Sequence, residues 1–320
     1  MIYKKNSAFS LIELSVVILV VGIFIAGVTT STILIRNYHL QLARSVTESS
    51  DVSSIKDLVL WLDVTALNSL TNSSDSTNIG DNETIKTWVD RNLGAKKFTF
   101  TEITSGGGPI YKFNGINNLP SLFFDGTLTG EGANAGDCLA VPYSMKLNPP
   151  QFTIFAVTKP VLQNSAGSFG AVFSSLLADS VTHTGGYILY KATWNAGDNT
   201  FEFDTGNSNG GQAWNYMHTN INLNKPYIVT SKLTGSLTSD IRSIYTNGAL
   251  AASQTGVVSF VNDGTSPNGS IFSIGCYSTS SRFYNGYTSE IIIFDRALSD
   301  EERVTVEKYL SKKYSILLSG

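Results

Sequence analysis

The feature that most constrains this chain is an apolar run near its N-terminus that carries a single charge. Residues 9–35 contain no charged side chain except Glu13, and no polar side chain occurs from Val16 to Val28. As a helix, a run of this length spans about 40 Å, which is enough to cross the hydrocarbon core of a bilayer. A carboxylate in hydrocarbon costs about 3 kcal/mol even on lenient insertion scales. The run therefore predicts a membrane-spanning helix in which one acid has a specific use.

Three interpretations of this segment compete: a secretory signal, a plain anchor, and a signal that is cut before the apolar run. A secretory signal needs small residues one and three positions before a cut that follows the run. Around Ala26 the position two earlier is Phe24, and apolar residues continue to Ile35, so this site is poor. A plain anchor leaves Glu13 unexplained.

The third interpretation fits the residues that surround the start of the run. A short basic leader with Lys4 and Lys5 precedes the sequence A-FSLIEL, which begins at Ala8, and an apolar helix follows. Residues 4–35 therefore resemble the type IV prepilin signal that type II secretion pseudopilins share. The resemblance implies that a prepilin peptidase and methylase cuts between Ala8 and Phe9 and methylates the new N-terminus. Ala8 departs from the usual glycine, and we expect processing to be slower for that reason.

A cut before Phe9 also gives Glu13 a role. The cut creates an ammonium group at the start of a helix, and Glu13 lies four residues further on, on the same face. A carboxylate is favoured near a helix N-terminus. The resemblance implies that in a filament Glu13 pairs with the Phe9 amine of a neighbouring pilin-like subunit. Assembly would then remove the cost of an unpaired acid in lipid.

The same resemblance sets the expected location and division of the chain. Lys4 and Lys5 before the span are balanced by Arg36 and Arg44 after it, so the positive-inside rule alone does not fix the orientation. The resemblance places a single helix in the bacterial inner membrane before assembly, with the body outside the cytoplasm, and a periplasmic or cell-surface filament afterwards. We divide the chain into a leader (1–8), a transmembrane and assembly helix with a hinge (9–57), and a body (58–320).

Short strand-like segments dominate the body. Runs such as FTIFAV and SEIIIF are rich in β-branched and aromatic residues, and Gly, Asn, Ser and Asp clusters separate them. Asn247-Gly248 between two such runs predicts a type I′ hairpin. Ser299 followed by Glu302 forms a capping box that predicts one short C-terminal helix. The fold class expected is mainly β: an antiparallel β-sandwich, with the long N-terminal helix before it and the short helix after it.

The body contains, in order, the stretches LVLWLDVTAL, IKTWVDRN, LPSLFFDG, FTIFAVTKP, IYTNGAL and SEIIIFDRALSDEERVTVEKYLSKKYSI. This order resembles a bacterial laminin-G-like domain of the concanavalin A-like superfamily, which has a jelly-roll sandwich. Such domains commonly bind carbohydrates or proteins, and some relatives are glycoside hydrolases. The resemblance implies a lectin-like module for adhesion, with a glycan or a surface protein as its ligand.

Three aromatic residues are candidates for a ligand platform. Trp194, Trp214 and Tyr216 lie in the Gly/Asn-rich stretches TWNAGDN and GGQAWNYMH. A sugar-binding platform needs a flat apolar face beside hydrogen-bonding amides, which these stretches supply. The alternative is that all three are buried anchors under long loops.

Catalysis is not expected. Glu202 and Asp204 lie two apart on a predicted strand, hence on one face, and glycoside cleavage needs two flanking carboxylates. Hydrolases on the resembled fold carry a third acid shortly after such a pair, where this chain has Thr205 and Gly206. We therefore expect a non-enzymatic protein with these two acids as solvated edge residues; the alternative function is a membrane-tethered glycan-active enzyme.

Cofactor, metal and nucleic-acid binding are not expected either. The net charge is −3, without the concentrated basic face that nucleic acid requires. The three histidines have no zinc-type spacing, and no Asp or Glu lies between Cys276 and Glu290, where some relatives of the resembled domain bind calcium. Cys138 and Cys276 form either a disulfide, which export would permit, or two separate half-buried thiols.

Overall fold

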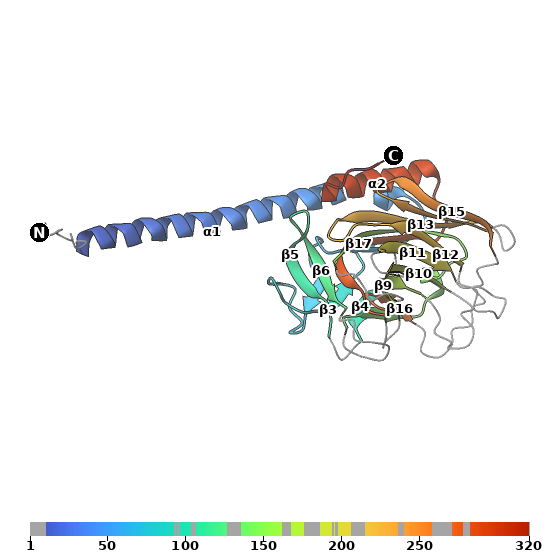
Figure 1. The fold of residues 1–320 in the computed structure, drawn as a ribbon, viewed down its shortest axis with the longest axis horizontal. Helices are drawn as coiled ribbons and strands as arrows, with labels where there is room; N and C mark the ends of the chain where they lie inside the picture. Colours follow the sequence, from blue (N-terminus) through green and yellow to red (C-terminus); the bar gives the residue numbers. More distant parts are fainter. Residues whose placement is uncertain are drawn as a thin grey trace, which may run out of the picture.

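A long helix and a two-sheet body make up the computed structural model. The helix α1 (Leu11–Glu48) begins the described part of the chain, and a second helix, α2 (Asp300–Tyr314), lies near its end. Figure 1 shows the first part of α1 as a rod that extends away from the body, while its last turns lie beside α2. The structure describes residues 11–92, 94, 97–103, 107–126, 136–161, 168–175, 186–193, 195, 198–205, 215–235, 240–257, 271–277 and 282–319.

The first sheet has eight strands that pair antiparallel. Seven of them follow one another across the sheet, and the eighth, β1, pairs with the second half of β17. In spatial order they are β15 (Ala249–Val257), β14 (Asp240–Thr246), β13 (Tyr227–Thr234), β8 (Phe152–Pro160), β17 (Asn285–Phe294), β6 (Leu119–Asp125) and β5 (Ile110–Ile116), with β1 (Leu58–Asp63) beside β17.

The second sheet has nine strands, again antiparallel. In spatial order they are β12 (Asn215–Asn220), β11 (Thr200–Thr205), β10 (Tyr187–Thr193), β9 (Ser168–Ser174), β16 (Ile271–Ile274), β7 (Leu139–Pro142), β4 (Thr99–Glu102), β3 (Ile85–Val89) and β2 (Leu70–Asn72). Two short 3₁₀ helices complete the described elements, η1 (Asp51–Ser54) and η2 (Met145–Leu147). The expected antiparallel sandwich with two flanking helices is confirmed.

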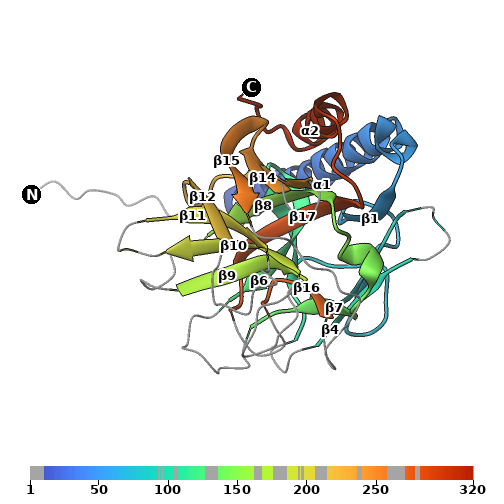
Figure 2. The same ribbon diagram turned by 90° about the vertical axis from the view of Figure 1, so that its right-hand side faces the viewer.

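Apolar side chains fill two layers. The main core lies between the sheets, because alternate residues of each strand face inward; its largest members include Trp88, Phe100, Phe152, Tyr187 and Phe201. A second layer lies on the outer face of the eight-stranded sheet, where the end of α1 and all of α2 cover it; Ala43, Trp61, Phe155, Val306 and Leu310 belong to it. Figure 2 shows both helices on this one side of the sandwich.

Two local signals in the sequence form the structures expected of them. Ser299 accepts a hydrogen bond from the Glu302 amide, and the Glu302 side chain accepts one from the Ser299 amide, so the capping box begins α2. Asn247 and Gly248 form the two-residue loop between β14 and β15, and both have positive φ, as a type I′ turn requires.

Candidate functional site

The first part of α1 presents apolar side chains to its surroundings on all sides. Leu11 is 87% exposed and Phe24 70%, and the other large apolar residues up to Ile35 are exposed as well. The helix is long and apolar enough to cross a membrane, and none of its most apolar stretch is buried against the part of the chain that the structure describes. An apolar surface of this size needs lipid or other helices around it.

Glu13 lies in the first turn of α1, at the far end of this surface from the body. That is the position at which a carboxylate complements the partial positive charge of the helix N-terminus. Ala8 and Phe9, the residues of the expected cut, lie outside the described residues. The pairing of Glu13 with an amine at Phe9 therefore stays a prediction.

The last turns of α1 are docked on the body. Ala43 and Thr47 are buried, and the Thr47 hydroxyl lies 3.1 Å from the Tyr309 hydroxyl of α2. Arg44 donates from Nε to the Thr65 carbonyl at 2.7 Å. These contacts fix the direction in which α1 leaves the sandwich.

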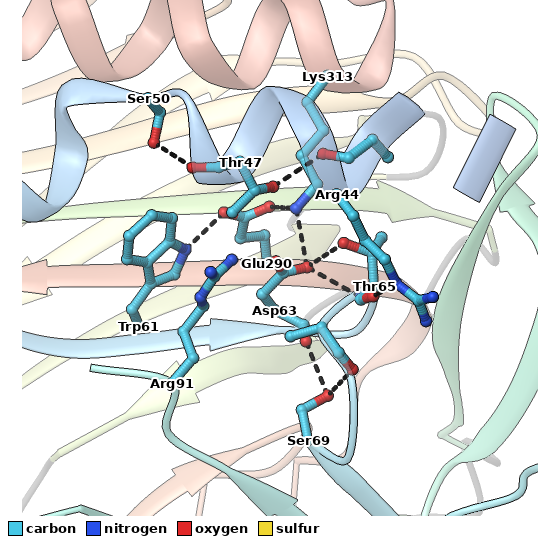
Figure 3. Close-up of polar contacts among 12 residues, drawn as sticks. Arg44, Thr47, Ser50, Trp61, Asp63, Thr65, Ser69, Arg91, Glu290 and Lys313 are labelled. Atoms are coloured by element: carbon cyan, nitrogen blue, oxygen red, sulfur yellow. Dashed lines mark hydrogen bonds and ion pairs between the residues drawn. The ribbon is translucent and has the colours of Figure 1, made fainter. Parts of the chain in front are cut away.

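A buried hydrogen-bond network lies under this junction (Figure 3). The Glu290 carboxylate on β17 is fully buried and accepts four hydrogen bonds, of which Figure 3 draws those from Trp61 and Lys313. Its Oε1 receives them from Trp61 Nε1 at 2.7 Å and from the Tyr309 hydroxyl at 2.6 Å. Its Oε2 receives them from Lys313 Nζ at 2.7 Å and from the Tyr314 hydroxyl at 2.8 Å. Burial raises the pKa of Glu290, and the four donors compensate part of the cost of its charge.

Asp63, at the end of β1, extends the network. The Lys313 ammonium lies 2.8 Å from its Oδ1, and Arg91 lies 2.8 Å from its Oδ2. The Thr65 amide and hydroxyl also donate to Oδ1. Burial opposes ionisation of Asp63, but the cations of Lys313 and Arg91 outweigh it and hold its pKa below the ordinary value.

Sequence reasoning missed most of this junction. Asp63 accepts a hydrogen bond from the Thr65 amide, as an aspartate in a turn does, and it also carries two ion pairs. A usable signal was present in the sequence. Glu290 interrupts the apolar strand SEIIIF, and Lys313 occurs on the apolar face of α2, so each charge falls at a position where burial is expected.

A second polar site lies on β10 and β11, in the nine-stranded sheet. Glu202 is 0% exposed and Asp204 1%, so the expectation that they are solvated edge residues is wrong. The physical reason is topological: β11 is hydrogen-bonded to β10 on one side and to β12 on the other, so it is not an edge. The prediction that the two residues share one face of a strand is confirmed, because both carboxylates lie beside the Tyr190 hydroxyl of β10.

Tyr190 joins the two carboxyl groups. Its hydroxyl lies 2.8 Å from Glu202 Oε2 and 2.8 Å from Asp204 Oδ2. One phenol has one proton to donate, so both short contacts are satisfied when one carboxyl is itself protonated and donates to the phenol oxygen. Burial, with the charge of Glu202 added, raises the pKa of Asp204 to about 7, against the hydrogen bond from Tyr190. The site can therefore hold an extra proton near neutral pH.

Cys138 and Cys276 form a disulfide in the structure, with their Cα atoms 5.5 Å apart. Both are fully buried and pack with Phe283, so the alternative of two half-buried thiols is wrong. The bridge joins residues that are 138 positions apart in the sequence. It therefore ties the start of β7 to the end of β16 within the nine-stranded sheet.

The expected ligand platform falls largely outside the described residues. This holds for Trp194, Trp214 and the side chain of Tyr216, whose backbone belongs to β12 and pairs with Asp204. Among the described residues, no group of three or more His, Cys, Asp or Glu side chains is placed to hold a metal ion.

Family models match two parts of the chain. Residues 3–29 match the prokaryotic N-terminal methylation motif. Residues 151–302 match the concanavalin A-like lectin/glucanases superfamily. The chain joins a type IV prepilin motif to a concanavalin A-like domain, as the sequence patterns predicted. No curated protein matches the chain.

Solved structures are similar to the chain at low identity. The CBM40 of a Ruminococcus gnavus IT-sialidase, bound to α2,3 sialyllactose, has 17% identity and a TM-score of 0.41, over 56% of this chain and 94% of that one. The receptor binding domain of botulinum neurotoxin type G has 13% identity and a TM-score of 0.48, over 80% of this chain and 52% of that one. Domain 4 of AbnA, a GH43 extracellular arabinanase from Geobacillus stearothermophilus, in complex with arabinotriose, has 13% identity and a TM-score of 0.44, over 78% of this chain and 98% of that one. Similarity at this level assigns no ligand to this chain.

Proposed function

We propose that this chain is a pilin-like subunit, a minor pilin or pseudopilin, that polymerises through α1 and displays its sandwich for adhesion or ligand binding. The observation that carries the proposal is the division of α1 into two halves. Its first half exposes an apolar surface, and its second half is docked on the body by Arg44 and Thr47. A helix of this kind can lie in lipid or among other helices at one end while it carries a folded domain at the other.

We propose that processing and assembly of the subunit begin in the inner membrane. A prepilin peptidase and methylase would cut before Phe9, and the body would lie outside the cytoplasm. Assembly with other pilin-like subunits would transfer the apolar half of α1 from lipid into a filament at the surface or in the periplasm. The match of residues 3–29 to the methylation motif supports this order of events.

The proposed role of the body is binding without catalysis. The superfamily matched by residues 151–302 includes lectins, and the two-sheet body formed by the described residues is larger than a simple filament subunit needs. A glycan, or a protein on another surface, is the proposed ligand class. A membrane-tethered glycan-active enzyme is the alternative, with Glu202 and Asp204 as its candidate acids, but both side chains are buried and neither can flank a glycosidic bond in this structure.

The mature N-terminus tests the assembly proposal. We expect mass spectrometry of the protein from its native membrane to find a chain that begins at a methylated Phe9. Ala8→Gly is the matched variant, and it should be processed at least as fast as the wild type. An intact Met1, or a chain that begins near Val28, would contradict the proposal.

A glycan array probed with the detergent-solubilised full chain tests the binding proposal. The full chain is needed because α1 covers part of the body's apolar surface. Selective retention of one glycan class, without release of reducing sugar, supports a lectin-like role. Release of reducing sugar that Glu202→Gln abolishes would favour the enzyme, and binding to no glycan or surface protein would leave the body as a spacer.

A further inference from the structure

A cleft of about 510 Å³ lies between α1 and the loops at β2 and β3. Two arginines of α1, Arg36 and Arg44, line it, together with the loop residues Leu67, Asn68 and Ile79. The lining is therefore basic on the side of the helix and mixed, with amide and apolar groups, on the side of the body. The roles proposed above for α1 in assembly and for the body in ligand binding do not assign a function to this cleft.

The two guanidinium groups are held by neutral partners. Arg36 lies over the ring of Phe113, with its Cζ 3.8 Å from the ring centroid, and Arg44 donates from Nε to the Thr65 carbonyl. Within the part of the chain that the structure describes, no ion pair joins either arginine to a carboxylate. Both are half-buried, so their positive charge is only partly screened by water.

One carboxylate lines the cleft, and it is already engaged. Glu83 accepts a hydrogen bond from Asn72 Nδ2 at 2.7 Å through its Oε2. Tyr111 also lines the cleft; burial raises its pKa to about 12, although the charges of Arg44 and Arg36 both act to lower it. The electrostatic effects of both arginines therefore reach Tyr111 in the cleft. The lining contains two positive charges and one negative charge, so its net charge is positive.

The position of the cleft along α1 identifies its occupant. The exposed apolar run of α1 ends at Ile35, and Arg36 is the next residue. The headgroup layer extends about 5 to 8 Å beyond the hydrocarbon on each side of a bilayer. Arg36 therefore falls within that layer when α1 spans a membrane, whereas Arg44 lies about 12 Å further along the helix, beyond the layer and at the end of the cleft away from the bilayer. Leu67 and Ile79 add apolar surface to the same cleft.

We propose that the cleft binds the headgroup of an anionic phospholipid through Arg36, with the positive charge of Arg44 at the other end of the cleft adding attraction, and so seats the body on the membrane surface before assembly. This inference rests on the proposed insertion of α1 into a membrane. Basic side chains at a membrane surface contribute about 1 kcal/mol each toward anionic lipid, which is about fivefold in affinity. Guanidinium suits a phosphate diester because it presents several donors in a fixed plane.

Native mass spectrometry of the full chain in detergent tests the proposal, with dioctanoyl phosphatidylglycerol and dioctanoyl phosphatidylcholine as probes. We expect the wild type to retain phosphatidylglycerol, which is anionic, at least tenfold better than phosphatidylcholine, which has no net charge. Arg36→Gln should lower that retention about fivefold, whereas Arg36→Lys, which keeps the charge, should retain most of it. Lys225→Gln, at an exposed lysine away from the cleft, should match the wild type. A thermal melt of each variant verifies that it is folded.

Equal retention of the two lipids, or unchanged retention in Arg36→Gln, would overturn the proposal. Displacement of phosphatidylglycerol by millimolar inorganic phosphate would also overturn the proposal, because it would indicate a site for free anions. Insertion of α1 is measured separately: the same protein is reconstituted into vesicles, the vesicles are extracted with alkali, and the fraction of protein that remains bound is determined. Loss from the vesicles would therefore refute the membrane step of the proposed function, whereas the lipid preference in detergent judges the cleft.

Discussion

The protonation of Asp204 links its burial to the stability of the fold. Its pKa is raised to about 7 in the folded protein, so between about pH 4 and pH 7 the folded state binds a proton that the unfolded state has lost. The free energy of unfolding should therefore fall as the pH rises through this window. Asp204→Asn removes this titration. We expect the free energy of unfolding of the variant to exceed that of the wild type by up to about 4 kcal/mol at pH 8 and by about 1.5 kcal/mol at pH 5. Urea unfolding at the two pH values measures the difference.

The control for this prediction is Asp198→Asn, at an exposed aspartate in the turn before β11. It should leave the pH dependence of unfolding unchanged. If Asp204→Asn raises the free energy of unfolding equally at pH 5 and pH 8, then a change in packing, and not the loss of the titrating proton, distinguishes the variant from the wild type.

Single residues show where sequence reasoning works and where it stops. The spacing of Glu202 and Asp204 was enough to place both on one strand face, because that follows from the period of a strand. Their burial depends on which strands flank β11, and strand order is a long-range property that no local pattern encodes. The disulfide between Cys138 and Cys276 could not be chosen over two thiols for the same reason.

At the scale of elements, the junction between α1, α2 and β17 depends on one lysine. Lys313 compensates both Glu290 and Asp63, and all three side chains are buried. Lys313→Met would leave two buried carboxylates without their shared cation. We expect a loss of about 3 to 5 kcal/mol in the free energy of unfolding, measured by denaturation of the full chain in detergent. The fluorescence of Trp61, which donates to Glu290, should report the loss locally.

Lys308→Met is the matched control on the same helix, because Lys308 is exposed. It should change the unfolding free energy by less than about 0.5 kcal/mol. Equal stability of Lys313→Met and the wild type would mean that the carboxylates become protonated at little cost, and that the cation is not what stabilises the junction.

Elements with strong local signals were predictable, and their docking was not. The capping box fixed the start of α2, and Asn247-Gly248 fixed the hairpin of β14 and β15, because both are short-range hydrogen-bonding or backbone effects. The end of α1 was expected as a helix end or hinge before the body. Its packing on α2 depends on Thr47 and Tyr309, which lie 262 residues apart, and no sequence pattern joins them.

At the scale of the whole molecule, the long helix and the sandwich have separate tasks that meet at one buried junction. Among the described residues, none of the most apolar stretch of α1 is buried, whereas the docked half shares an apolar layer with α2. A pull on the helix would therefore reach the body through the contacts of Arg44 with Thr65 and of Thr47 with Tyr309, and Tyr309 in turn donates to Glu290. This arrangement suits a subunit whose anchor must leave the membrane while its displayed domain stays folded.

Glu13→Ala separates insertion from assembly in the whole subunit. Removal of the acid lowers the cost of placing α1 in lipid, so we expect the variant to insert into membranes at least as well as the wild type. Its incorporation into filaments should fall at least tenfold, because the amine of a neighbouring subunit loses its partner. Glu13→Gln, which keeps the shape without the charge, should show the same defect if the charge is what matters. Quantitative immunoblots of the membrane and sheared-filament fractions measure both steps, and normal incorporation of either variant would contradict the role given to this carboxylate.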